Sequence, residues 1–159
     1  MASKTGAVIS AVITLILFVG IPYLLPGYIP PDLMTQIEQS GFNLDSFTSQ
    51  IMIIGVATAA LTLVGGFVEP TSIIALLVKM AQAGFSLILI IVFLGAGNIA
   101  SLGYTEFRVA MQGVQSTITV DLRVFVYISI GTIFLKVLQV YLEWKEARVE
   151  AAPPGRIAP

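Results

Sequence analysis

Long apolar stretches alternate with short polar segments along the chain, and four of these stretches are long enough to cross a membrane. A hydrocarbon core of about 30 Å needs about 20 helical residues. The pattern predicts transmembrane helices over residues 6–25, 51–68, 72–97 and 124–142, with the last one continuing into the cytoplasm as a charged helix to residue 150. Residues 151–159 contain Pro153, Pro154 and Gly155, and we expect them to form a flexible tail.

Composition supports a membrane protein. Hydrophobic residues make up 57% of the 159 residues and charged residues 11%, which is more apolar surface than the core of a soluble domain of this size buries. The predicted fold class is therefore an all-α membrane protein, a bundle of four transmembrane helices that forms a single domain over residues 1–150.

The first apolar stretch follows Lys4 and so resembles the start of a signal peptide. It is long, ends in the sequence IPYLLP over residues 21–26, and has no small-x-small cleavage motif. We expect it to be retained as a signal anchor and first transmembrane helix.

The distribution of basic residues predicts the orientation, because cytoplasmic loops are enriched in Lys and Arg. With a cytoplasmic N-terminus, the inner side carries Lys4, Lys79, Lys136, Lys145, Arg148 and Arg156, and the outer side carries Arg108 and Arg123. We therefore expect a multi-pass protein of a cell membrane with both termini in the cytoplasm.

Two outer connections show patterns of their own. Between the first two spans, the Pro30-Pro31 pair and Gly41 bound an amphipathic segment, which indicates either a short helix at the membrane surface or a plain connecting loop. Between the last two spans, residues 104–124 alternate between polar and apolar side chains, which predicts a β-hairpin outside the cytoplasm.

The predicted hairpin has a register in which paired residue numbers sum to 229. This register places Glu106 opposite Arg123 and Arg108 opposite Asp121. The other side of the hairpin is apolar and is a candidate interface; it consists of Phe107, Val109, Met111, Ile118, Val120 and Leu122. A two-stranded hairpin is marginal in water, so we expect this side to rest on the membrane, on the helices or on another chain.

A Lys-x-x-Gln motif occurs twice within the predicted spans, as Lys79 with Gln82 and as Lys136 with Gln139. At 1.5 Å per residue, both lysines lie roughly 10 Å inside the cytoplasmic boundary. Intramembrane charges are costly and usually matched, so these four residues are candidates for binding an anionic lipid or a carboxylate of a partner subunit. The alternative is that the lysines extend their charges to the headgroups.

Two further features of the spans predict packing. Glu69, in the turn between the second and third spans, is a candidate partner of Lys79 or Lys136. Gly55 and Ala59 form a small-xxx-small motif, which we expect to pack the second helix against the third.

Candidate catalytic chemistry is sparse. The chain contains no Cys and no His, which excludes disulfides, thiolate nucleophiles and the usual zinc and haem ligands. We expect no cofactor and no metal site. A net charge of −1 without a basic run excludes the electrostatic footprint of a nucleic-acid-binding protein.

These features favour a noncatalytic accessory or assembly subunit of a larger membrane complex, whose partners are membrane lipids and other membrane subunits or copies of itself. The alternative is a homo-oligomeric channel or small transporter with a lysine-bearing pathway that favours anions. A third hypothesis, an enzyme acting on lipids, has only Glu69 and Lys79 as nearby candidate groups.

Overall fold

The computed structural model describes residues 4–111 and 114–151. Its first long helical segment consists of α1 (Lys4–Leu15), the π-helical turn η1 (Ile16–Gly20) and α2 (Ile21–Tyr28). The other long helices are α4 (Leu44–Phe67), α5 (Ile73–Leu94) and α6 (Arg123–Glu150). The connections contain helix α3 (Pro31–Gln39), the 3₁₀ turn η2 (Ile99–Ser101) and strands β1 (Tyr104–Met111) and β2 (Val114–Asp121).

Within the described residues, four helical segments are long and apolar enough to cross a membrane, as predicted. The second of them begins at Leu44, seven residues before its predicted start. Asn43 explains this start, because its side chain accepts a hydrogen bond of 2.8 Å from the backbone N–H of Ser46 and so caps the helix. Helix α5 ends at Leu94, before Ala96 and Gly97 adopt positive φ angles of 50° and 84°.

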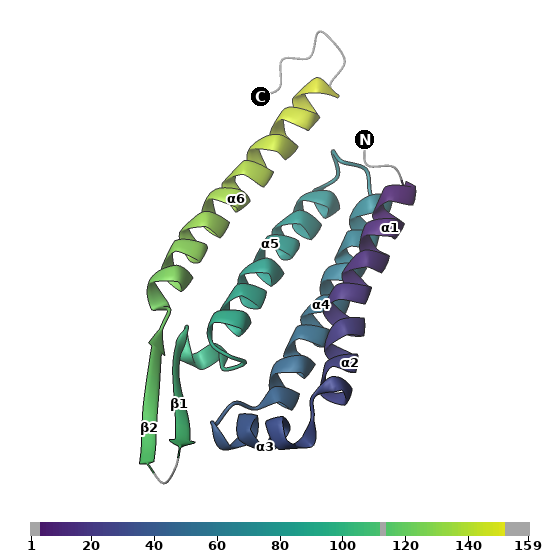
Figure 1. The fold of residues 1–159 in the computed structure, drawn as a ribbon. Helices are drawn as coiled ribbons and strands as arrows, with labels where there is room; N and C mark the ends of the chain where they lie inside the picture. Colours follow the sequence, from purple (N-terminus) through teal and green to yellow (C-terminus); the bar gives the residue numbers. More distant parts are fainter. Residues whose placement is uncertain (1–3, 112–113, 152–159) are drawn as a thin grey trace.

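The four long helices are arranged as an open row. They lie side by side in the order α1, α4, α5, α6, and the main contacts join neighbours in this order (Figure 1). Both ends of the described chain lie at the same end of the helices along their long axes, called here the termini end. Helix α3 and the two strands lie at the other end, called here the hairpin end (Figure 1). Sequence periodicity predicts that a helix has an apolar side, but not how many neighbours cover it.

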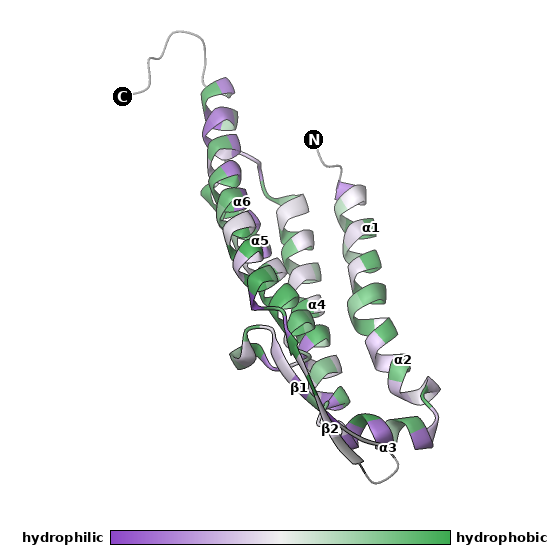
Figure 2. Ribbon diagram, turned by 60° about the vertical axis from the view of Figure 1, so that its left-hand side comes forward, coloured by the Kyte–Doolittle hydropathy of each residue, from purple (hydrophilic) through white to green (hydrophobic). Residues whose placement is uncertain are grey.

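Hydrophobic packing is strongest in the middle of the row. Ile51 and Ile54 of α4 and Val92 of α5 form a buried cluster, with four aromatic or aliphatic side chains packed around it. Helix α6 is covered on one side only, and among its side chains Val126 and Val140 are buried. Figure 2 shows long apolar stretches in the helices, whereas hydrophilic residues gather in α3 and in the last turns of α6.

Small residues bring α4 close to the first helical segment. A Cβ atom added at Gly55 would lie 2.5 Å from Cβ of Phe18, and one added at Gly66 would overlap Cβ of Ala7. Ala59 lies between these positions on α4 and is buried. The expectation that Gly55 packs the second span against the third is therefore wrong, because Gly55 faces η1.

The hairpin between α5 and α6 is present, but its predicted register is wrong. Paired residue numbers sum to 225, so Glu106 lies opposite Thr119 and Arg108 lies opposite Thr117. The shift of four residues is even, and each side chain therefore keeps its predicted side of the hairpin. Strand β2 ends at Asp121 because Leu122, whose N–H donates to the carbonyl of Gly103 over 2.8 Å, is already the N-cap of α6.

The amphipathic segment after the first span is a helix, α3, followed by Gly41 at a φ of 86°. Its C-cap residue, Ser40, accepts a hydrogen bond of 3.1 Å from the backbone N–H of Arg108. The hairpin is thus attached to the first connection as well as to α6. Residues 152–159, most of the predicted flexible tail, lie outside the described residues.

Candidate functional site

Lys79 forms an ion pair that the sequence reasoning missed. Its Nζ lies 3.9 Å from Oε2 of Glu143 on α6, and both side chains are about half exposed, at 49%. The Nε2 of Gln139 donates to Oε1 of the same carboxylate over 2.8 Å. Glu69, the expected partner, makes no ion pair with Lys79 or Lys136 among the described residues. The signal for Glu143 was its i+4 spacing from Gln139.

Gln82 forms a hydrogen bond with the neighbouring helix α4. Its Nε2 donates to Oγ1 of Thr62 over 3.3 Å, which joins α5 to α4. The hydroxyl of Thr62 in turn donates to the carbonyl of Thr58, one turn earlier on α4. The two residues of the first Lys-x-x-Gln motif therefore bind different helices, Lys79 to α6 and Gln82 to α4.

Lys136 is exposed and has no hydrogen bond or ion pair among the described residues. It belongs to a line of polar residues on α6, called here the α6 polar stripe, that consists of Ser129, Thr132, Lys136, Gln139 and Glu143. Steps of three and four residues place these side chains on one side of the helix. The contact between Glu143 and Lys79 shows that this side borders α5.

The termini end of the stripe has an aromatic marker. Trp144 donates from its indole N–H to the carbonyl of Ser72, the N-cap of α5, over 3.0 Å. The guanidinium of Arg148 lies 4.8 Å from the centre of the Trp144 ring. Tryptophan is typical of a membrane–water interface, and this contact places Trp144 level with the start of α5.

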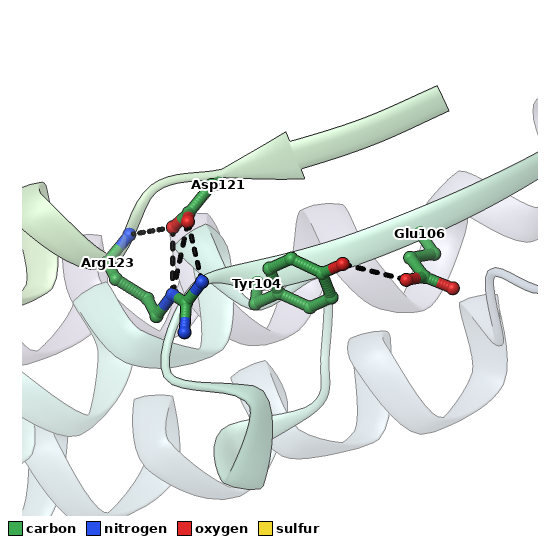
Figure 3. Close-up of polar contacts among 4 residues, drawn as sticks. All are labelled: Tyr104, Glu106, Asp121 and Arg123. Atoms are coloured by element: carbon green, nitrogen blue, oxygen red, sulfur yellow. Dashed lines mark hydrogen bonds and ion pairs between the residues drawn. The ribbon is translucent and has the colours of Figure 1, made fainter. Parts of the chain in front are cut away.

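A second polar cluster lies where the hairpin meets α6 (Figure 3). Arg123 donates from Nε and Nη2 to Asp121, over 3.0 Å to Oδ1 and 2.7 Å to Oδ2, and its backbone N–H also donates to Oδ1. Its guanidinium lies 5.0 Å from the centre of the Tyr104 ring, whose hydroxyl donates to Glu106 over 2.7 Å.

Electrostatics agree with this geometry. Hydrogen bonds from Arg123 hold the pKa of Asp121 below its usual value. The hydrogen bond to Glu106 raises the pKa of Tyr104. The sequence had paired Asp121 with Arg108 across the strands, whereas the structure uses Asp121 to hold the first turn of α6. The cluster therefore acts as a joint between hairpin and helix.

The candidate interface on the hairpin is partly described. Phe107 lies opposite Ile118, and Val120 lies opposite Thr105. Phe107 is half-buried, whereas Ile118 is 51% exposed. Leu122 is outside the hairpin, at the N-cap of α6. The side chains of the other two predicted members, Val109 and Met111, lie outside the described part of the structure.

Other features of the described residues add no catalytic constellation. They contain no group of three or more His, Cys, Asp or Glu residues that could hold a metal ion. An open groove of about 460 Å³ lies along the hairpin-end half of α4 and is lined by Asp45, Thr48, Ser49, Met52, Ile53 and Val56. Comparisons with protein-family models, with curated proteins and with solved structures found no match.

Proposed function

We propose that the chain is a noncatalytic subunit of a larger membrane complex and that it assembles through the side of α5 and α6 that carries the α6 polar stripe. The observation that supports this proposal is the exposed Lys136, which has no hydrogen-bond or ion-pair partner among the described residues and lies on a helix with one neighbour in the row. Lipid tails offer such a group no hydrogen bond, whereas a further protein helix can.

The cost of leaving this side to lipid decides the argument. A lysine near the centre of a transmembrane helix costs about 2.5–3.5 kcal/mol on insertion scales. Gln139 and Glu143 are also exposed on the same side. In a chain that works alone, the insertion free energy of these polar side chains is not offset. In a subunit, it is offset when a partner helix supplies groups that pair with them.

Native mass spectrometry of the protein, gently extracted from its own membrane, tests this proposal. We expect other polypeptides to remain attached at a fixed stoichiometry. Recovery of the chain alone, as a monomer or as a closed ring, contradicts the proposal.

A second candidate is a homo-oligomeric channel or small transporter that favours anions. The length of the α6 polar stripe favours it, because Glu143 lies 14 positions after Ser129, which corresponds to about 21 Å of helix. In liposomes, Lys79→Met combined with Lys136→Met should change anion selectivity if the stripe lines a pathway, and Lys145→Met is the control. If anion flux through the double variant is unchanged, the result supports the proposal of a noncatalytic subunit.

A further inference from the structure

The two intramembrane lysines are not equivalent, because their helices run in opposite directions. In an α-helix each Cα–Cβ bond tilts toward the N-terminus of the helix. Helix α5 begins at the termini end and α6 begins at the hairpin end (Figure 1). The side chain of Lys79 therefore leaves its helix toward the termini end, which is the nearer membrane surface, and there it forms the ion pair with Glu143. The side chain of Lys136 leaves α6 in the opposite direction, toward the membrane interior.

Depth places Lys136 beyond the reach of lipid headgroups. It lies 8 residues from Trp144 and 13 residues from Arg123, which correspond to about 12 Å and about 20 Å along the helix. These distances sum to about the thickness of a hydrocarbon core. An extended lysine side chain covers only about 6 Å from Cα to Nζ, so its ammonium group stays inside either surface.

Charge balance on this side of the row leaves one positive charge. The carboxylate of Glu143 is engaged by Lys79 and by Gln139. No other charged residue occurs on α6 between Arg123 and Glu143 except Lys136 itself. A group that matches Lys136 must therefore be negative, lie at membrane depth and come from outside the described chain.

We propose that Lys136 binds a carboxylate on a transmembrane helix of a different polypeptide, which lies along the α6 polar stripe with Thr132 and Gln139 as flanking contacts. This inference rests on the proposed function and names the chemistry of the partner. A second copy of the chain fits less well, because a symmetric contact along the stripe brings Lys136 against Lys136 of the copy, and like charges repel.

Cysteine cross-linking in native membranes tests the position of the partner, since the chain itself contains no cysteine. Thr132→Cys lies on the stripe, and Phe134→Cys, at a position 64% exposed on the other side of α6, is the matched control. With a thiol-to-amine or photoactivated cross-linker, we expect Thr132→Cys to capture a different polypeptide. The cross-linked peptide should belong to a transmembrane segment with an Asp or Glu within one turn. A segment without an acid, or equal capture by both variants, overturns the inference.

Charge variants test the contact itself. Lys136→Met should lower the Thr132→Cys cross-link roughly tenfold or more, whereas Lys145→Met should leave it unchanged. Lys136→Glu should restore the cross-link only when the acid of the partner is changed to Lys. If the heteromeric complex persists and Lys136→Met has no effect, the inference fails while the proposed function stands. Loss of a retained anionic phospholipid in Lys136→Met, without loss of the cross-link, also overturns it.

Discussion

Gly55 and Gly66 hold the first helical segment against α4 by having no side chain. Both positions face backbone or Cβ atoms of that segment, and such atoms cannot move aside as the tip of a flexible side chain can. At Gly55 the neighbour is Phe18, four residues before Pro22. Proline has no N–H to donate to the carbonyl at this spacing, and its ring pushes that carbonyl away. The π-helical turn thus coincides with the close approach at Gly55.

Replacing Gly55 by Ala should separate η1 from α4. We expect Gly55→Ala to lower the free energy of unfolding by about 1–3 kcal/mol, the usual cost of overpacking. Thermal unfolding in detergent, followed by circular dichroism, measures the change. Gly84→Ala is the matched control, because a Cβ there meets nothing within 4 Å and the substitution favours the helix. An equal response of both variants would show that the contact with Phe18 is unimportant.

The Lys-x-x-Gln motifs show what residue spacing can and cannot predict. Spacing correctly indicated that polar groups lie within the spans, but it treated the two motifs as copies. In the structure, Gln82 donates a hydrogen bond to Thr62 and Gln139 donates one to Glu143, whereas Lys79 forms an ion pair with Glu143. These partners depend on which helix lies beside each side chain, and no local pattern contains that information.

At the scale of elements, the alternation of side chains along the hairpin was predicted correctly from the sequence, whereas the register between its strands was not. The two-residue period assigned side chains to their sides correctly, since strand side chains alternate strictly. The register rested on two opposite-charge pairs, each worth little at an exposed site. The start of α6 outweighed these pairs. Leu122 is the N-cap of α6, and Asp121 accepts a hydrogen bond from the backbone N–H of Arg123 in the first turn, so β2 ends at Asp121.

Disulfide trapping can check the register. The backbone N–H of Arg108 points away from β2 and donates to Ser40, so Arg108 and Thr117 form a non-hydrogen-bonded pair. Pair types alternate along a strand, so Glu106 and Thr119, two residues away, also form a non-hydrogen-bonded pair, whose Cα atoms are closely spaced. Glu106→Cys with Thr119→Cys should oxidise readily to an intramolecular disulfide, seen as a mobility shift that reductant removes. Glu106→Cys with Arg123→Cys, the pair of the alternative register, should stay reduced. The reverse result would restore the register predicted from charge.

At the scale of the whole molecule, the open row determines how the protein meets its surroundings. Each inner helix is covered by two neighbours, whereas α6 is covered by α5 and otherwise exposed. An even number of spans among the described residues also places both ends of the described chain together, at the termini end (Figure 1). The basic residues predict that this end faces the cytoplasm.

Single cysteines read out this topology in intact cells. Thr5→Cys and Glu150→Cys should be protected from a membrane-impermeant maleimide until the membrane is opened, whereas Ser116→Cys on β2 should react at once. All three positions are exposed, so protection reports the membrane rather than burial. Labelling of Thr5→Cys and Glu150→Cys from outside would invert the orientation. Labelling of only one of them would contradict the arrangement of the helices.

The sequence by itself determined the four spans, the short helix between the first two, the hairpin and the side of the hairpin on which each residue lies. These features follow from hydrophobic length and from the periods of helices and strands, which are local properties. Tertiary structure alone decided the open row, the hairpin register, the partner of Gly55 and the pairing of Lys79 with Glu143. Each of these depends on contacts between segments distant along the chain, and many different arrangements satisfy the same local pattern.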